Sequence, residues 1–116
     1  MSDRPSIMYL YDMQDAATKI IRYTAKLDFA NFSTNELVKD AVARNIEIIG
    51  EACNKLPNSY YLKYPEMQWS KIIGMRNRLI HGYFDVDIPM LWNTINQIIP
   101  TFSDQIKQLI LKEEMT

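Results

Sequence analysis

The strongest constraint on the fold of this chain is a spacing of three and four between the core-type residues of its first quarter. The residues on this stripe are Leu10, Met13, Ala17, Ile20, Thr24 and Leu27, whereas Asp12, Asp15, Lys19, Arg22 and Lys26 fall between them. Such spacing puts the stripe on one face of an α-helix and the charges on the other. We therefore predict an amphipathic helix from Ser6 onward.

The composition favours helices in the rest of the chain as well. The chain has 116 residues, of which 47% are hydrophobic and only three are glycine, and long stretches separate its five prolines. A chain of this length can bury one core, and the scarcity of turn residues argues against a β architecture. We expect an all-α protein with a single domain that spans residues 1–116.

A second helix is predicted from about Ser33 to Leu56. Ser33 and Glu36 have the spacing of a capping box, in which each side chain satisfies a free backbone N–H at a helix start. Pro57 would end the helix. A wide apolar arc on this helix indicates burial against more than one neighbour. Its residues are Val38, Val42, Ile49, Cys53 and Leu56, with Leu37, Ala41, Ile48 and Ala52 on one side.

Individual residues of the second helix predict particular contacts. Gly50 costs roughly 1 kcal/mol relative to Ala in a helix interior, and a close approach of another backbone could offset this cost. Asn45 falls inside the apolar arc and therefore needs a hydrogen-bond partner. Arg44, Glu47 and Glu51 lie on the opposite side. We interpret these three as a solvated, paired face, with catalytic acids as the alternative.

The second half of the chain predicts two more helices. Residues 57–68 form a connector with one short helical turn, and we expect its tyrosines to pack over the end of the bundle. A third helix should run from Trp69 to about Ile80, with Gly82 just past its end.

The last helix should begin at Asp87 as the N-cap, with Pro89 in its first turn. Its apolar residues stay in helical phase across Pro100, which predicts one kinked helix. They are Leu91, Ile95, Ile98, Phe102, Ile106 and Leu109. The expected architecture is an up-and-down four-helix bundle.

Several functional classes are disfavoured by what the sequence lacks. Cys53 is the single cysteine, so no intrachain disulfide can form, and we interpret it as an inert core thiol. There is no signal segment and no apolar run near 18 residues, which predicts a cytoplasmic protein without membrane association. One histidine and one cysteine do not make a metal site, and we expect no cofactor. The net charge of −1 argues against a broad nucleic-acid-binding surface.

The residues of the candidate active site fall within the segment 74–83. This segment contains the only histidine, His81, together with Arg76 and Arg78, and no acid lies between Lys71 and Arg78. Cleavage of RNA by its own 2′-hydroxyl needs a proton acceptor, a proton donor and cations. One chain supplies a single imidazole. A homodimer would place two copies of His81, Arg76 and Arg78 across one cleft, which meets this requirement without a metal.

The same segment also has a purely structural interpretation. Cations near a helix C-terminus complement the helix dipole, and Gly82 would cap the helix. Asn77 and His81 share a helix face with Arg78 nearby, whereas Arg76 lies roughly 140° from His81 on an ideal helix. For the site to form, either the helix end is distorted or Arg76 reaches the site from another direction.

The pattern of Arg76, four residues, His81, one residue and Tyr83 resembles the signature of HEPN-domain ribonucleases, specifically the HepT toxins. The likeness extends to the blocks Asn35–Ala52, Trp69–Met75 and Phe84–Asp87. This resemblance implies a HEPN-type homodimer whose composite site, at the interface, cuts RNA without a metal and leaves a 2′,3′-cyclic phosphate.

The resemblance also implies a role for each motif residue. His81 would transfer protons and Arg76 would bind the scissile phosphate. Asn77 matches the polar residue that usually follows the arginine. Arg78 is not part of the family pattern, and we expect it to support the site as a nearby cation.

HepT proteins are typically encoded beside a minimal nucleotidyltransferase antitoxin, which in some pairs adenylylates the motif tyrosine. By position this tyrosine is Tyr83, and an anionic AMP group two residues from His81 would block the cleft and repel RNA. Tyr83 could equally be an ordinary exposed aromatic residue. The competing hypothesis is a non-catalytic helical subunit that regulates a nucleotidyltransferase. The Arg76 and His81 pair favours the enzyme, and the near-neutral charge favours the regulatory subunit.

Overall fold

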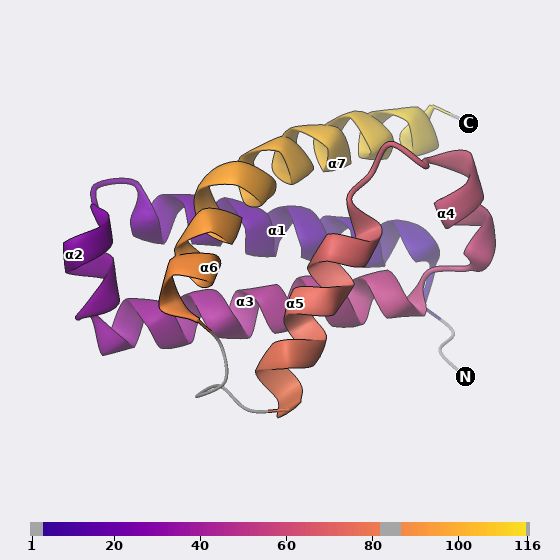
Figure 1. The fold of residues 1–116 in the computed structure, drawn as a ribbon. Helices are drawn as coiled ribbons and strands as arrows, with labels where there is room; N and C mark the ends of the chain where they lie inside the picture. The colour runs from indigo at the N-terminus through magenta and orange to yellow at the C-terminus, as the bar shows by residue number, and fades with distance from the viewer. Residues whose placement is uncertain (1–3, 82–86, 116) are drawn as a thin grey trace.

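The structure, a computed structural model, describes residues 4–81 and 87–115, and every regular element in these ranges is helical (Figure 1). In chain order the elements are α1 (Ser6–Thr24), α2 (Phe29–Ser33), α3 (Glu36–Lys55), α4 (Asn58–Lys63), α5 (Trp69–His81), α6 (Ile88–Asn93), the π-helical turn η2 (Thr94–Ile98) and α7 (Ile99–Glu114). The all-α prediction is confirmed.

Helices α1, α3 and α7 run along the length of the molecule, and α5 crosses α3 steeply (Figure 1). Helix α1 packs against both α3 and α7, while α3 also packs against α5. The wide apolar arc of α3 is thus explained by two neighbours, as predicted. Each fully buried Leu, Ile, Met or Phe side chain contributes about 1.5–3 kcal/mol to folding. The largest fully buried side chains include Leu10, Met13, Ile20, Phe32, Ile46, Ile49, Ile72, Leu91, Ile99, Phe102 and Ile106.

The start of α3 differs from the prediction. Ser33 is the last residue of α2, and its hydroxyl donates to a backbone carbonyl of that same helix at 2.9 Å. The predicted capping box of Ser33 and Glu36 is therefore wrong. Asn35 occupies the N-cap instead, where its Oδ1 accepts from the backbone N–H of Val38 at 3.0 Å. Asn35 has the extended backbone of an N-cap residue, whereas Ser33 is already helical.

Most side-chain predictions for α3 are confirmed. Asn45 is buried, and its Nδ2 donates to the carbonyl of Ala41 at 2.8 Å within the same helix. Arg44 and Glu47 form an i,i+3 ion pair of 3.7 Å near the surface, which supports the solvated-face interpretation. Leu37 lies in the first turn of α3, is 80% exposed and does not belong to the buried arc.

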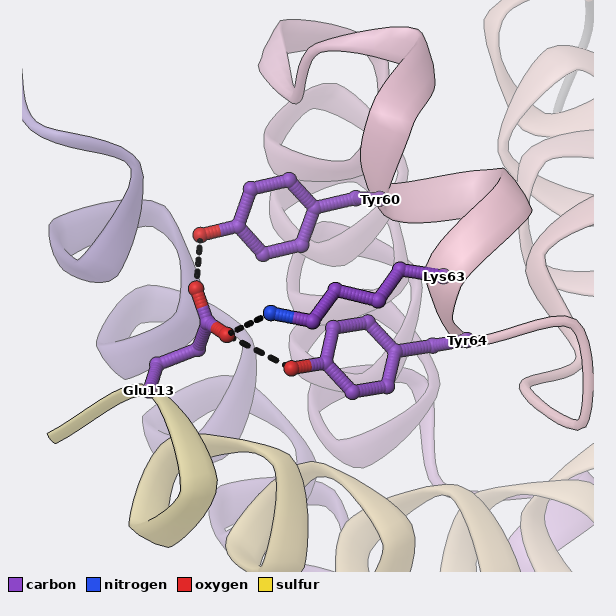
Figure 2. A network of polar contacts seen from close by, with 4 residues as sticks. All are labelled: Tyr60, Lys63, Tyr64 and Glu113. Carbon is purple, nitrogen blue, oxygen red and sulfur yellow. Dashed lines mark hydrogen bonds and ion pairs between the residues drawn. The ribbon is translucent and has the colours of Figure 1, made fainter. Parts of the chain in front are cut away.

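The connector after α3 contains one short helix, α4, as predicted, and three of its side chains converge on Glu113 of α7 (Figure 2). The hydroxyls of Tyr60 and Tyr64 donate to the Glu113 carboxylate at 2.7 and 2.6 Å, and the Lys63 ammonium pairs with it at 3.1 Å. Trp69 Nε1 donates to the backbone carbonyl of Tyr64 at 3.0 Å. The network therefore ties the end of α7 to the beginning of α5, and the tyrosines pack against the bundle as expected.

Ionisation in this network is set by its hydrogen bonds. The hydroxyls of Tyr64 and Tyr60 hold the pKa of the Glu113 carboxyl below its ordinary value. Burial, together with the hydrogen bond to Glu113, raises the pKa of Tyr60 to about 12. The carboxylate is therefore charged and both hydroxyls are protonated near neutral pH.

The last helix is bent, as predicted, at a π-helical turn. Asp87 is the N-cap of α6 and Pro89 lies in the first turn, although the Asp87 side chain makes no capping hydrogen bond. Helix α6 continues through η2 into α7, and the two helices point in different directions (Figure 1). Pro100 lacks a backbone N–H, and its ring would clash with the carbonyl of Asn96 in a regular α-helix. The π turn lies directly before it and accommodates the ring.

Candidate active site

The candidate active site lies on the C-terminal half of α5. One face of this helix is anchored in the core through Trp69, Ile72, Met75 and Leu79, all of which are buried. The helix carries no acidic residue. Its polar residues Arg76, Asn77, Arg78 and His81 therefore belong to a helix that is anchored in the core.

Arg76 occupies a position different from that of its neighbours. It is half-buried, and its Cβ lies against Gly50 of α3, whereas Asn77, Arg78 and His81 are exposed. Helix α5 stays α-helical through His81. The sequence left two alternatives, a distorted helix end or an Arg76 that reaches the site from a direction different from that of His81. The structure supports the second. A close approach does occur at Gly50, but the Arg76 side chain makes it, and not another backbone as predicted.

Among the residues that the structure describes, the Arg76 guanidinium makes one hydrogen bond. Its Nη1 donates to Asn77 Oδ1 at 3.0 Å. Its Nε is buried and has no hydrogen-bond partner within residues 4–81 and 87–115. The structure thus brings Arg76 and Asn77 together, with packing rather than hydrogen bonds holding the buried part of the side chain.

Arg78 and His81 lie at the exposed end of the helix. Arg78 Nη1 donates to the sulfur of Met90 at 2.8 Å, a contact that links α5 to α6. His81 is the last residue of α5. The helix-dipole interpretation fits the position of Arg78 and His81 at this helix end, but it gives no reason for the partial burial of Arg76. Gly82 and Tyr83 lie outside the described residues.

The chemistry of this surface suits an anionic ligand. Lys71, Arg76 and Arg78 supply positive charge, and His81 supplies an imidazole, without a carboxylate on the same helix. A guanidinium is well matched to phosphate oxygens because its planar N–H groups can donate to two of them. Within the described part of the chain, no group of three or more His, Cys, Asp or Glu side chains is placed to hold a metal ion.

Searches against known proteins agree on one family. A family model described as "Ribonuclease HepT-like" matches residues 13–109, which is most of the chain. The chain belongs to the HepT-like ribonuclease family. A Thermococcus cleftensis protein named "Probable ribonuclease HepT" is 37% identical over 101 residues, covering 87% of this chain and 92% of the relative. "Putative RNase MJ1380" of Methanocaldococcus jannaschii is 35% identical over 107 residues, covering 92% and 98%. No solved structure matches the chain significantly.

Membership of the HepT-like family confirms the resemblance drawn from the sequence motif. The matched region includes Gly50 as well as Arg76 and His81. The individual roles of Arg76, Asn77, Arg78 and His81 stay predictions. Among the described residues, no helix of this HepT-like chain has both the length and the hydropathy needed to cross a bilayer.

Two contacts of the site were missed by sequence reasoning. The sequence pointed to a close approach at Gly50 but not to Arg76 as its partner. It gave no signal for Met90 as the acceptor of Arg78, because a methionine in an apolar helix usually needs no explanation beyond packing. The only sequence signal for either contact was Gly50, a glycine inside a long helix, which indicates a close approach by another part of the chain.

Proposed function

We propose that this HepT-like protein is a metal-independent endoribonuclease toxin of a toxin–antitoxin pair. The observation that carries the proposal is the presence of Arg76 and His81 on one acid-free helix of a chain from a ribonuclease family. These are the groups that phosphodiester cleavage requires, a cation for the phosphate and an imidazole for the proton.

The proposed reaction is internal attack by an RNA 2′-hydroxyl. One His81 imidazole takes the hydroxyl proton, and the oxygen bonds to the adjacent phosphorus. The Arg76 guanidinium donates hydrogen bonds to the phosphate oxygens as negative charge accumulates on them. The bond from phosphorus to the 5′-oxygen then breaks, and a second His81, which starts in its protonated imidazolium form, gives that oxygen a proton. The products are a 2′,3′-cyclic phosphate and a 5′-hydroxyl.

A homodimer would supply the second imidazole. Each chain has one histidine, so in the proposed reaction the acid and the base are two copies of His81, and the cleft between them would form the composite site. Sedimentation at micromolar concentration should give twice the monomer mass of 13.6 kDa. A monomer that still cut RNA would contradict the composite site.

The function is tested by toxicity and by RNA cleavage. Expression of the wild type should stop bacterial growth, and the purified protein should cut RNA to 2′,3′-cyclic phosphate ends. His81→Ala and Arg76→Ala should each lose about 100-fold or more in cleavage rate while remaining folded. Lys71→Ala is the matched control, because it removes an exposed cation of the same helix outside the motif, and it should have a far smaller effect.

The proposed partner is a minimal nucleotidyltransferase antitoxin that adenylylates Tyr83. Incubation with such an enzyme and ATP should add the mass of AMP to the peptide that contains Tyr83 and should abolish RNA cleavage. Tyr83→Phe should still cut RNA and should resist both changes. Neutralisation without modification of this peptide would mean that the partner acts by tight binding or at another residue.

A second candidate function is a non-catalytic subunit that regulates the nucleotidyltransferase. The net charge of −1 favours it, since RNA affinity depends largely on cationic contacts. This candidate predicts that the wild type and His81→Ala are equally harmless to cells and equally inactive on RNA. Both should then bind the nucleotidyltransferase and change its activity.

A further inference from the structure

Gly50 is a buried glycine in the interior of α3, where glycine lowers helix stability relative to alanine. A Cβ atom added at Gly50 would lie 2.3 Å from the Cβ of Arg76 and 2.4 Å from its Cγ. Carbon atoms in favourable contact are about 3.5–4.0 Å apart. Helix α3 and the Arg76 side chain therefore meet at a separation that only glycine permits.

The crowded atoms belong to the base of the Arg76 side chain. Its Cβ is fixed by the α5 backbone, so another rotamer can move Cγ but cannot relieve the contact with Cβ. Helix α5 is itself held in the core by Ile72, Met75 and Leu79, which are buried. A side chain at position 50 would therefore displace α5 and also change the rotamer of Arg76.

The far end of Arg76 depends on this packing for its position. Within the described residues its Nε has no hydrogen-bond partner although it is buried, and the recorded polar contact is the one from Nη1 to Asn77. Asn77 is an exposed neighbour on the same helix, so it moves with α5 and gives no independent restraint from α3. The contact with Gly50 connects the Arg76 side chain directly to α3.

We infer that Gly50 is a positioning residue for Arg76. Its missing side chain sets how closely α5 crosses α3 and thereby aims the guanidinium at the RNA phosphate. The catalytic part of this inference rests on the proposed function, whereas the contact between Gly50 and Arg76 does not.

Gly50→Ala and Gly74→Ala form a matched pair of variants. Each replaces a helical glycine with alanine, so each gains the same intrinsic helix propensity. A Cβ added at Gly74 would meet nothing within 4 Å. Any difference between the variants therefore reports the contact with Arg76 rather than the exchange of glycine for alanine.

The first measurement is independent of enzymatic activity. In an NMR spectrum of arginine Nε–H groups, the Arg76 resonance is identified by its loss in Arg76→Lys. The resonance should shift in Gly50→Ala and stay in place in Gly74→Ala. An unshifted resonance in Gly50→Ala overturns the inference. If Gly50→Ala does not fold, the double variant Gly50→Ala/Arg76→Gly removes the crowded carbons; recovered folding supports the contact, and continued unfolding overturns it.

The second measurement is single-turnover RNA cleavage at a temperature where circular dichroism shows each variant to be fully folded. A misplaced Arg76 should lower the rate in Gly50→Ala by about 100-fold. RNA affinity, measured by fluorescence anisotropy, should change by less than about threefold, because the lost interaction belongs to the transition state. Gly74→Ala should cleave like the wild type.

The outcomes separate the two claims. Normal cleavage by Gly50→Ala beside an inactive Arg76→Ala overturns the positioning role and leaves the proposed function intact. A wild type that does not cut RNA refutes the proposed function, and the Arg76 resonance then decides the contact alone.

Discussion

Removal of the Glu113 carboxylate should cost this protein a large part of its stability. The carboxylate accepts hydrogen bonds from Tyr60 and Tyr64, and its side chain is only 17% exposed. Hydrogen bonds to a charged group are worth about 1.5–3 kcal/mol each, and partial exposure reduces that value. We expect Glu113→Ala to lower the free energy of unfolding by roughly 2–4 kcal/mol. Glu113→Gln keeps a neutral acceptor and should cost about half as much.

The effect of Glu113→Gln should depend on pH with a predictable sign. The folded protein holds the pKa of Glu113 below its ordinary value of 4.5, so this stabilisation is present above that pH and is lost as the pH falls through the folded pKa. The pKa of Tyr60 is raised from 10.0 to about 12, so its contribution is lost as the pH rises from 10 to 12. The stability difference should be constant between about pH 5 and 10.

Urea unfolding followed by far-ultraviolet circular dichroism measures these differences. Glu114→Gln is the control, because Glu114 is the next residue and accepts one exposed hydrogen bond, from Tyr11. Its effect at pH 7 should be much smaller than that of Glu113→Gln. Equal effects of the two variants would refute the reasoning, and so would a Glu113→Gln effect that persists undiminished at pH 3.

Three further predictions address the thiol, the core and the chemistry. Cys53 is fully buried and burial raises its pKa to about 12, so iodoacetamide should label it only in denaturant; rapid labelling of the native protein would contradict this. Phe102→Ala should lower the free energy of unfolding by about 3–5 kcal/mol in the same urea assay, because Phe102 is fully buried and packs edge-on against Trp69. RNA cleavage should continue in excess EDTA, and a loss of activity that a divalent ion restores would contradict the proposed metal-independent reaction.

The long helices could be predicted from sequence because their signals are local. The apolar stripes of α1 and α5 indicate which face of each helix is buried, and this does not depend on which element covers that face. The start of α3 could not be predicted in this way, because Ser33 and Asn35 both suit an N-cap and lie two residues apart. Helix α2 makes Asn35 the N-cap, because Ser33 is part of α2. It forms around Phe32, which is fully buried against Trp92 of α6, a contact that local sequence does not reveal.

The site shows the same division. Helical geometry correctly separated Arg76 from His81, because that separation depends only on residue spacing in a helix that stays regular. It did not predict the hydrogen bond between Arg76 and Asn77. The location of Arg76 in the bundle depends on Gly50, which belongs to another helix. The sequence could therefore name the groups of the site but not the contact that holds one of them.

The π turn at Thr94–Ile98 gives the last helical segment the equivalent of one inserted residue. One residue rotates a helix surface by roughly 100°, so the stripes before and after the turn can face different neighbours. Before it, Trp92 packs on α2; after it, α7 packs along α1. The continuous segment from α6 to α7 can therefore pack against two different helices. A regular helix of the same length would face only one of them. The Arg78 contact with Met90 connects the candidate site to α6, the part whose orientation depends on the π turn.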